Sequence, residues 1–501
     1  MISSLFIIAA AVTVNFDKEI GKVRPELHSS GFGPQICSCP QESMDAIKSM
    51  GFNASRTHDW ALINPNQRVC DYFHMFPLMK LDAKNPENYV FGPTDYLLKR
   101  TREEMGHDIF FRLGTSIEHS GPKVHFNALI PEDFDKVAEI FAGTIRHYNR
   151  GWANGFNWGI KYWEIWNEPD GNNTMWCLPD GDLGVGETED ERKADMAART
   201  LKRRDLFVRF FVTCLKRLKG EFPDIKVGGP ALCRMKPDYF TAILKACKEA
   251  GVAPDFISWH HYTSKPDVIM NAIVDARKLC DELGFKNCEL IIDEWHYLPP
   301  QGWAGIRSAD PDVQKEVWSG PASHNGIDSS CFNLTVLSRM QTSALGQNYY
   351  YGCRNTGWWG FMDECKRKYK VYYGLKLFGD LIRQRSLICE SSGAKDVTVF
   401  AVKGADGGRK AVLVTDYRSG SAEDISVEVD GVPADAKVSA WVHDYTRDFE
   451  SIPVKFEGGK VLIKKADANS AAYLVTFVQP LQGQGNTIFQ NHVGTGPGSG
   501  L

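Results

Sequence analysis

The stretch that decides the fold is Trp163-Glu164-Ile165-Trp166-Asn167-Glu168-Pro169-Asp170 (WEIWNEPD), where an apolar run breaks into polar residues and a proline. Such a run, ended by turn-forming residues, is typical of a buried strand that gives way to a loop. Seven other stretches show the same pattern. The eight expected strands lie around His28–Gly33, Ala54–His58, Ile109–Leu113, Trp158–Trp166, Lys226–Pro230, Phe256–His260, Leu290–Asp293 and Gln347–Gly352.

Helix-periodic segments separate these strands. Apolar residues recur at helical spacing after Pro131, and similar stripes begin at Leu206 and Phe240. Alternating strands and helices predict a parallel sheet, and eight such units over roughly 350 residues fit a (β/α)8 TIM barrel with loop insertions. A doubly wound open sheet is the alternative, but no glycine-rich phosphate fingerprint follows the first strand.

The sequence pattern changes from about Leu387. Short runs of alternating apolar and polar residues follow, separated by Gly- and Asp-rich turns, which predicts a small β-sandwich. Its expected strands are Val397–Val402, Ala411–Thr415, Ile425–Val429, Val438–Val442, Val461–Ile463 and Ala472–Val478. The predicted organisation is an N-terminal segment (1–24), a barrel (25–383), a β-sandwich (384–479) and a flexible tail (480–501) rich in Gly and Gln.

The N-terminal segment has two interpretations. Leu5–Val12 (LFIIAAAV) has the length of a signal-peptide core, yet no Lys or Arg precedes it. It could equally run into Val12–Phe16 as a strand that completes the β-sandwich. The 13 cysteines contain no CxxC pair and indicate neither a disulfide framework nor a zinc site. We therefore leave localisation open and favour the cytoplasm slightly.

Composition narrows the class of partner. The 501 residues are 43% apolar and 24% charged, which is typical of a globular chain. A net charge of −4 and the lack of any Lys/Arg run argue against a nucleic-acid surface, and no run reaches transmembrane length. Aromatic residues make up 12% of the chain, which suits stacking against flat, uncharged ligands. We expect a neutral small-molecule or oligosaccharide partner, with no cofactor or metal. The oligomeric state cannot be derived from the sequence.

Two glutamates stand where barrel strands end. Glu168 follows one strand and Glu294 follows another, and a TIM barrel gathers its active site at the carboxyl ends of its strands. A retaining glycosidase needs one carboxylic acid to protonate the leaving oxygen and one carboxylate to attack the anomeric carbon, about 5–5.5 Å apart. Glu168 and Glu294 are the candidate pair, whereas Glu164 is expected to be a barrel-interior or packing residue.

Tryptophans beside both glutamates favour this interpretation. They supply an apolar wall that can keep one carboxyl group protonated near neutral pH. Asn167 would donate a hydrogen bond to the 2-hydroxyl of the sugar. The alternative, that each glutamate pairs with a surface cation, fits poorly with two carboxyl groups at apolar strand ends, where an unpaired charge is costly.

The motifs together resemble family 39 of the clan A glycoside hydrolases, which includes β-xylosidases and α-L-iduronidases. The resemblance covers roughly residues 28 to 380 and rests on WNEP, on Glu294, and on four further motifs. These are Arg56-Thr57-His58-Asp59, Arg146-His147-Tyr148, Val227-Gly228-Gly229-Pro230 and Ser258-Trp259-His260-His261-Tyr262.

The resemblance implies roles for individual residues. Glu168 would be the acid/base and Glu294 the nucleophile, with Tyr262 hydrogen-bonded to it. The residues implied to contact the sugar are Asn167, His58, Asp59, His260, Tyr262, His119 and Trp359. His261 and His296 have no such counterpart and are expected to be structural.

The expected activity is therefore that of an exo-acting, β-xylosidase-like retaining glycosidase on plant or algal oligosaccharides. Alternatives are an endo-acting, β-galactosidase or arabinosidase enzyme of the same clan, or a catalytically silent carbohydrate-binding relative. Three features depart from the family pattern and bear on the sugar bound. Insertions at 171–200 and 299–323 should overhang the site, and the eighth strand carries Tyr349-Tyr350-Tyr351 in place of the usual tryptophan.

Overall fold

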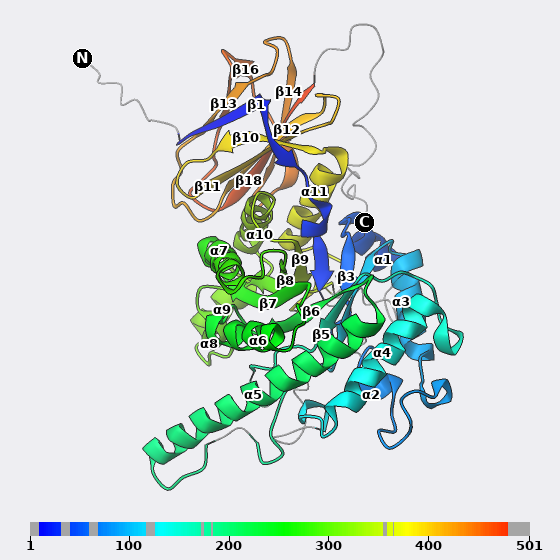
Figure 1. Ribbon diagram of the computed structural model, residues 1–501. Helices are drawn as coiled ribbons and strands as arrows, with labels where there is room; N and C mark the ends of the chain where they lie inside the picture. Colours follow the sequence, from blue (N-terminus) through cyan, green and yellow to red (C-terminus); the bar gives the residue numbers. More distant parts are fainter. Residues whose placement is uncertain are drawn as a thin grey trace, which may run out of the picture.

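The computed structural model describes residues 10–31, 41–59, 69–116, 126–171, 175–181, 184–353, 358–363 and 365–478. Eight parallel strands close into a barrel in the order in which they follow along the chain (Figure 1). The predicted TIM barrel is confirmed. Its strands are β2 (Ser29–Gly31), β3 (Ala54–Arg56), β4 (Asp108–Leu113), β5 (Tyr162–Ile165), β6 (Lys226–Leu232), β7 (Phe256–Thr263), β8 (Glu289–Tyr297) and β9 (Gln347–Tyr351).

Each strand overlaps the stretch that predicted it, and the ends differ for local reasons. The β5 strand begins at Tyr162, later than the expected Trp158, because Gly159 adopts φ +66°, which is incompatible with a strand. The β7 and β8 strands extend beyond their apolar runs, to Thr263 and Tyr297, and so carry polar side chains within the sheet.

Helices surround the barrel, and the three predicted stripes lie on α4, α5 and α6. The helices are α1 (Gln41–Ser49), α2 (Tyr72–Met75), α3 (Gly92–Glu103), α4 (Phe134–Arg150), α5 (Glu189–Glu221), α6 (Pro237–Glu249), α7 (Pro266–Leu283), α8 (Gly302–Ile306), α9 (Pro311–Ser319), α10 (Ile327–Met340) and α11 (Lys370–Gln384). Among the described residues, no helix is both long enough and apolar enough to cross a membrane.

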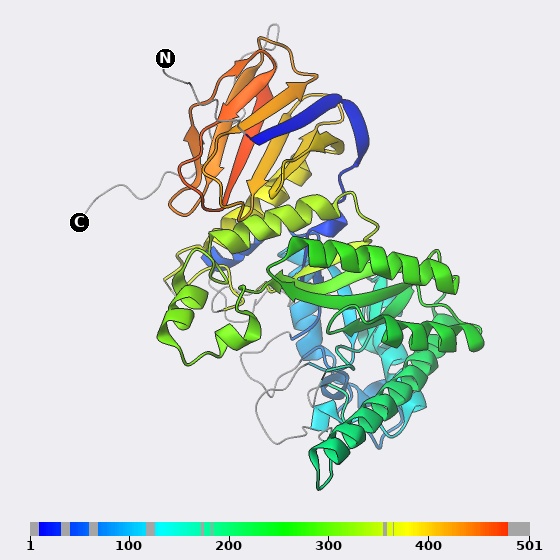
Figure 2. The same cartoon turned by 90° about the vertical axis from the view of Figure 1, so that its left-hand side faces the viewer.

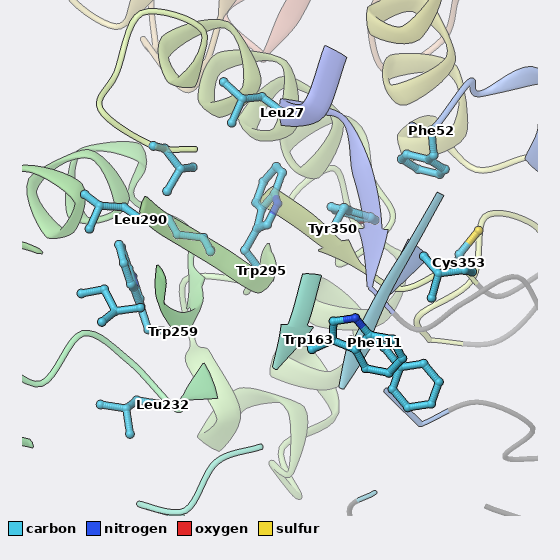
Figure 3. Packing of buried hydrophobic residues seen from close by; sticks show 14 of the residues in the cluster. Leu27, Phe52, Phe111, Trp163, Leu232, Trp259, Leu290, Trp295, Tyr350 and Cys353 are labelled. Carbon is cyan, nitrogen blue, oxygen red and sulfur yellow. The ribbon is translucent and has the colours of Figure 1, made fainter. Parts of the chain in front are cut away.

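The main hydrophobic core lies between the barrel and its helices. Large rings of alternate strand residues, such as Trp163, Trp259 and Trp295, are fully buried in this layer (Figure 3). A smaller apolar cluster, with Phe110 and Ile291 among its members, fills the barrel interior. This packed interior forms a floor, so that polar residues gather at the carboxyl ends of the strands.

The remaining strands form one continuous ten-stranded sheet, which curls around a core of its own (Figure 2). The strands are β1 (Ala10–Lys22), β10 (Leu387–Ser392), β11 (Val397–Lys403), β12 (Lys410–Asp416), β13 (Ile425–Asp430), β14 (Lys437–His443), β15 (Asp448–Ile452), β16 (Phe456–Glu457), β17 (Lys460–Ile463) and β18 (Ala471–Val478). This confirms the predicted accessory β domain. The sequence predicted a β-sandwich for it, and the structure forms the domain from one continuous sheet that curls around its core. The proposed boundaries at 24/25 and 383/384 remain predictions.

The N-terminal strand lies inside this sheet. Val12 and Val14 of β1 are buried, and β1 pairs with β10 antiparallel and with β13 parallel. Helix α10 connects the two parts of the molecule: Ser470 Oγ donates a 2.6 Å hydrogen bond to Asp328, and Ser330 Oγ lies 2.9 Å from His443 Nε2. The β domain is thus anchored against the barrel.

The acidic run of the first insertion forms the start of α5. Thr188 caps the helix by accepting from the Glu191 N–H, and the Glu191 carboxylate accepts from the Thr188 N–H. This N-terminal part of α5 is solvent-exposed and extends beyond the barrel (Figure 1). Cysteines within the described residues are free thiols, buried except at Cys233 and Cys365.

Candidate active site

Glu168 sits in a tight turn directly after β5. Trp166 and Glu168 adopt left-handed backbone conformations, with φ of 78° and 44°, which cost energy for residues other than glycine. Backbone hydrogen bonds hold the turn: the Trp166 N–H donates to Leu113 O at 2.6 Å, and the Glu168 N–H donates to Ala231 O at 2.9 Å. The turn directs the Glu168 carboxyl group towards β7.

Glu294 lies on β8 at an irregularity in the sheet. The pairing of β8 with β9 shifts register between Ile292 and Trp295. Such a bulge changes the direction of side chains and is common beside active sites. As a result, the consecutive residues Asp293 and Glu294 both contact one buried cation, Arg56, at 3.1 and 3.3 Å. In a regular strand, consecutive side chains point to opposite faces of the sheet, so one of these two carboxylates would point away from Arg56.

The two predicted carboxyl groups meet. An oxygen of Glu168, an oxygen of Glu294 and a ring nitrogen of His260 all lie within 4.8 Å of one another. His260 Nδ1 lies 2.8 Å from Glu168 Oε1 and 3.7 Å from Glu294 Oε1. His260 reaches both because it pairs in register with Glu294 across β7 and β8. The three side chains also have the spacing of a metal site, so the expected absence of a metal stays a prediction.

Arg56, at the end of β3, is a central residue whose role the sequence did not reveal. Its guanidinium is fully buried and contacts, among the described residues, Glu164 at 2.7 Å, Asp293, Glu294, and Asn167, whose Oδ1 accepts at 2.7 Å. A planar guanidinium can hold several carboxylates in fixed directions. The motif that contains Arg56 was recognised, but nothing in the sequence singled it out above its neighbours.

Glu164 belongs to this network, although it was expected only to pack in the barrel interior. It is fully buried, as expected, and accepts from Arg56 Nε and from Ser258 Oγ at 2.7 and 2.6 Å. Burial, assisted by Asp293 and opposed by Arg56, raises the pKa of Glu164 to about 8. Through Arg56, Glu164 is joined to Glu294.

Asn167 is held in one orientation by Arg56, and its predicted contact with a sugar stays a prediction. Its side chain is fully buried, and the bond from Arg56 to its Oδ1 fixes the amide. The Asn167 Nδ2 atom is buried without a hydrogen-bond partner among the described residues. A buried amide donor left unpaired is costly unless a ligand uses it. The site thus presents one fixed donor beside the carboxyl pair.

The carboxyl pair and His260 titrate together. Burial raises the pKa of Glu294 to about 7, and the nearby Glu168 charge adds to this, while His260, Arg56 and the bond from Tyr262 oppose it. Burial also acts to raise the pKa of Glu168, but the hydrogen bond and charge of His260 outweigh it, so that this pKa is lowered. Without a ligand and below about pH 7, the pair therefore carries one proton, on Glu294.

His260 remains protonated because carboxylates surround its imidazole ring. Burial lowers the pKa of His260, but the carboxylates of Glu294 and Asp293 more than compensate, so that its pKa lies well above the usual value. Tyr262 donates a hydrogen bond to Glu294 Oε1, as the resemblance implies. His260, Tyr262 and Glu294 thus form one contiguous cluster.

The other predicted sugar-contacting residues surround this cluster, with one exception. His58 Nε2 lies 4.0 Å from Glu294 Oε2, and Asp59 Oδ2 accepts from the Tyr351 hydroxyl at 3.0 Å. The Trp359 ring packs 5.7 Å from Tyr262. His119 lies outside the described residues.

His296 is buried and structural, as expected: its Nδ1 bonds the Tyr297 carbonyl and its Nε2 the Tyr350 hydroxyl, at 2.8 and 2.5 Å. His261 is half-buried, and burial lowers its pKa to about 4. Neither histidine forms a hydrogen bond or an ion pair with Glu168 or Glu294. The expectation for both histidines agrees with these positions.

A basic hollow of about 440 Å³ adjoins Glu168, between α5 and the start of α6. Its lining begins at Pro169 and Asp170, and Asp170 pairs with Lys236 at 2.5 Å. Arg234, on the same lining, is exposed. The Tyr239 hydroxyl is buried and has no hydrogen-bond partner among the described residues. The hollow therefore combines surplus positive charge with an unused hydroxyl.

Comparison with known proteins places the chain beside glycoside-cleaving enzymes. No protein-family model matches it. A β-xylosidase from Geobacillus stearothermophilus is 27% identical over 141 residues, which are 28% of this chain and 23% of that protein. The match thus spans less than a quarter of that relative's length.

Solved structures are similar over nearly the whole chain. A glucosidase from Croceicoccus marinus has a TM-score of 0.69 at 18% identity, over 95% of this chain and 100% of that one. A β-xylosidase from Caulobacter crescentus and an α-L-arabinofuranosidase from Thermotoga maritima both reach 0.62 over 94% of this chain and 100% of theirs, at 15% and 12% identity. The shared fold is a barrel with a β-rich second domain, in agreement with the resemblance to clan A.

Proposed function

We propose that the protein is a retaining glycoside hydrolase. The observation that carries this proposal is the separation of the two carboxyl groups, which have oxygens within 4.8 Å of each other. Retaining enzymes hold the pair about 5–5.5 Å apart, whereas inverting enzymes separate them by about 6.5–9.5 Å to admit a water molecule. The barrel, the paired glutamates and the β-xylosidase relative all support this class.

The reaction proceeds in two steps. A Glu294 carboxylate oxygen attacks the anomeric carbon, the glycosidic C–O bond breaks, and Glu168 gives its proton to the leaving oxygen. In the second step, Glu168 takes a proton from water as the water oxygen attacks the same carbon. The Glu294 ester bond breaks, which returns both carboxyl groups to their starting states.

Substrate binding has to move the shared proton. In the free pair the proton resides on Glu294, whereas the first step needs it on Glu168. A bound glycoside presents an acceptor oxygen to Glu168, which favours its protonated form. It also places the electron-poor anomeric carbon against Glu294, which favours the carboxylate. The distance between the two groups is short enough for this redistribution to be local.

The surrounding residues prepare these steps. Arg56 and Tyr262 both donate to Glu294 and hold its carboxylate in a fixed direction. The free Nδ2 of Asn167 donates to the 2-hydroxyl of the sugar, and this bond strengthens as positive charge develops on the ring. Trp359, packed on Tyr262, forms an apolar wall for the same sugar.

The preferred substrate class is a β-xyloside, on the strength of the β-xylosidase relative. A panel of aryl β-xyloside, β-galactoside, α-arabinopyranoside and iduronide tests it, with product stereochemistry followed by NMR. We expect turnover of the xyloside with a product that first appears in the configuration of the substrate. An inverted first product contradicts the retaining mechanism, and no turnover of any glycoside favours a silent carbohydrate-binding protein.

A further inference from the structure

A second hollow, of about 550 Å³, lies where the 299–323 insertion meets the β domain. We call it the tryptophan hollow, because Trp318 of α9 and Trp358 line it together with His324 and Asn325. The Trp318 side chain is 52% exposed, although it is a large apolar ring. Aromatic side chains that line a concave surface are typical of ligand-binding sites.

A chain of aromatic rings connects this hollow with the carboxyl pair. Tyr262, which donates to Glu294, packs 5.7 Å from Trp359, whose ring lies 6.1 Å from that of Trp358. The Trp318 ring follows, 4.2 Å from Trp358. A row of packed aromatic rings therefore leads from the wall of the sugar site to the hollow.

His324 gives the hollow a polar group without a partner. Its ring stacks between His296 and Trp358, at 3.9 and 3.8 Å, and is 1% exposed. Neither ring nitrogen of His324 has a hydrogen-bond partner among the described residues, and the same holds for Asn325 Oδ1. Burial lowers the pKa of His324 well below its usual value, so that it offers one N–H donor and one acceptor. A ligand hydroxyl group can accept from the donor or donate to the acceptor.

Three cations and one anion line the hollow, and each cation has a partner: Lys368 Nζ lies 4.9 Å over the Tyr372 ring. Lys370 pairs with Asp448 at 2.7 Å, and Arg367 pairs with Asp363 at 3.0 Å. A flat apolar platform and a neutral donor–acceptor pair suit an uncharged polyol ring, which has one apolar face and a rim of hydroxyl groups.

We propose that the tryptophan hollow is a subsite for a further neutral sugar unit on the glycone side of the substrate. The leaving group lies beside Glu168, after β5, whereas this hollow lies after β8 and β9, three strands further round the barrel. An extended glycone would pass from the carboxyl pair over Trp359 to Trp318. This inference rests on the proposed glycosidase function and favours an enzyme that accepts chains longer than one sugar on this side.

Binding and turnover test this proposal separately. Xylobiose, xylotriose and xylotetraose are titrated calorimetrically against the inactive Glu294→Gln enzyme, with and without Trp318→Ala. We expect Trp318→Ala to weaken xylotetraose binding about tenfold and xylobiose less than about twofold. Trp318→Phe, which keeps a ring, should restore most of the loss. Tyr96→Ala, which removes an exposed ring on α3, is the matched control.

Activity distinguishes failure of the subsite from failure of the proposed function. With Glu294 intact, Trp318→Ala should leave turnover of 4-nitrophenyl β-xyloside unchanged and lower kcat/KM for xylotetraose. The same loss of binding at every chain length, or no loss at any length, overturns the subsite. Absence of aryl xyloside turnover in the unmodified enzyme argues against the function, whereas the binding series still decides the subsite.

Discussion

Glu168 and Glu294 look alike in the sequence, since each follows an apolar run and has a tryptophan nearby, yet their surroundings differ. Glu168 is held by His260 and adjoins the basic hollow. Glu294 is held by Arg56 and Tyr262, and aromatic rings continue from it towards the tryptophan hollow. Two equivalent carboxyl groups are thereby given unequal tasks, because the groups around each decide where a proton and a charge are stable.

Removing either carboxyl group gives the largest expected effect and separates the two tasks. Glu168→Ala and Glu294→Ala should each lower turnover of 4-nitrophenyl β-xyloside by at least about 10³-fold. Added azide should restore product in both variants, measured by NMR. We expect a β-glycosyl azide from Glu168→Ala, since the ester on Glu294 still forms, and an α-glycosyl azide from Glu294→Ala.

The exposed residue Glu282 on α7 supplies a control, since Glu282→Ala should keep full activity. Circular dichroism and Tm should show that both catalytic variants remain folded. The same azide anomer from both variants would mean that the roles of Glu168 and Glu294 are not distinct.

Arg56 tests whether the environment of Glu294 is as specific as its contacts indicate. Arg56→Lys retains the positive charge but loses the planar fork that bonds Glu164, Asn167 and Glu294. We expect kcat to fall about 10²-fold, because misplacement of a catalytic group by about 1 Å has this effect. Tm should fall too, since buried carboxylates lose partners.

Arg100→Lys, at an exposed pair with Glu104, is the matched control and should change neither kcat nor Tm appreciably. Normal kcat in Arg56→Lys would show that charge alone, without the fork, positions Glu294.

The pH dependence follows from the single proton of the pair. The pKa of Glu294, raised by burial to about 7, governs its loss in the free enzyme. As the pH rises through about 7 the pair loses the proton that Glu168 must deliver, so kcat/KM for an alkyl xyloside should fall above this pH. A 2,4-dinitrophenyl xyloside needs no acid and should lack this basic limb.

Tyr262→Phe refines the same test. The bond from Tyr262 lowers the pKa of Glu294, so its removal should shift the basic limb to higher pH. A limb that remains with the dinitrophenyl substrate would assign the titration to a group other than the acid.

The sequence was sufficient for the fold because each barrel strand breaks from apolar to polar residues where the active site begins. It also located Glu168, Asn167 and Glu294, which stand at those breaks. It could not foresee that Asp293 faces Arg56 together with Glu294, since strand alternation predicts opposite directions and only the bulge on β8 reverses it.

The network around Glu164 and two strands of the β domain could not be predicted from the sequence, because they depend on contacts between residues far apart in the chain. The charge network of Glu164 joins three strands and has no local signature. In the β domain, β15 and β16 were not predicted, since Asp448–Ile452 is polar and Phe456–Glu457 is too short to show a period. Both become strands through their partners β14 and β17.

The smallest expected effect concerns the basic hollow and contrasts it with the tryptophan hollow, whose lining cations are ion-paired or lie over an aromatic ring. Arg234 is exposed on a lining that begins one residue after Glu168, so a charge on the leaving group would pass near it. For a xyloside of 4-hydroxybenzoate, Arg234→Gln should raise KM by about two- to fivefold at low salt, with little change for the neutral 4-nitrophenyl xyloside. Added salt should remove the difference, because exposed charges are screened within about 10 Å at 0.1 M. Equal changes in KM for both substrates would show that Arg234 affects the shape of the hollow and not its charge. The two hollows would then differ in geometry alone.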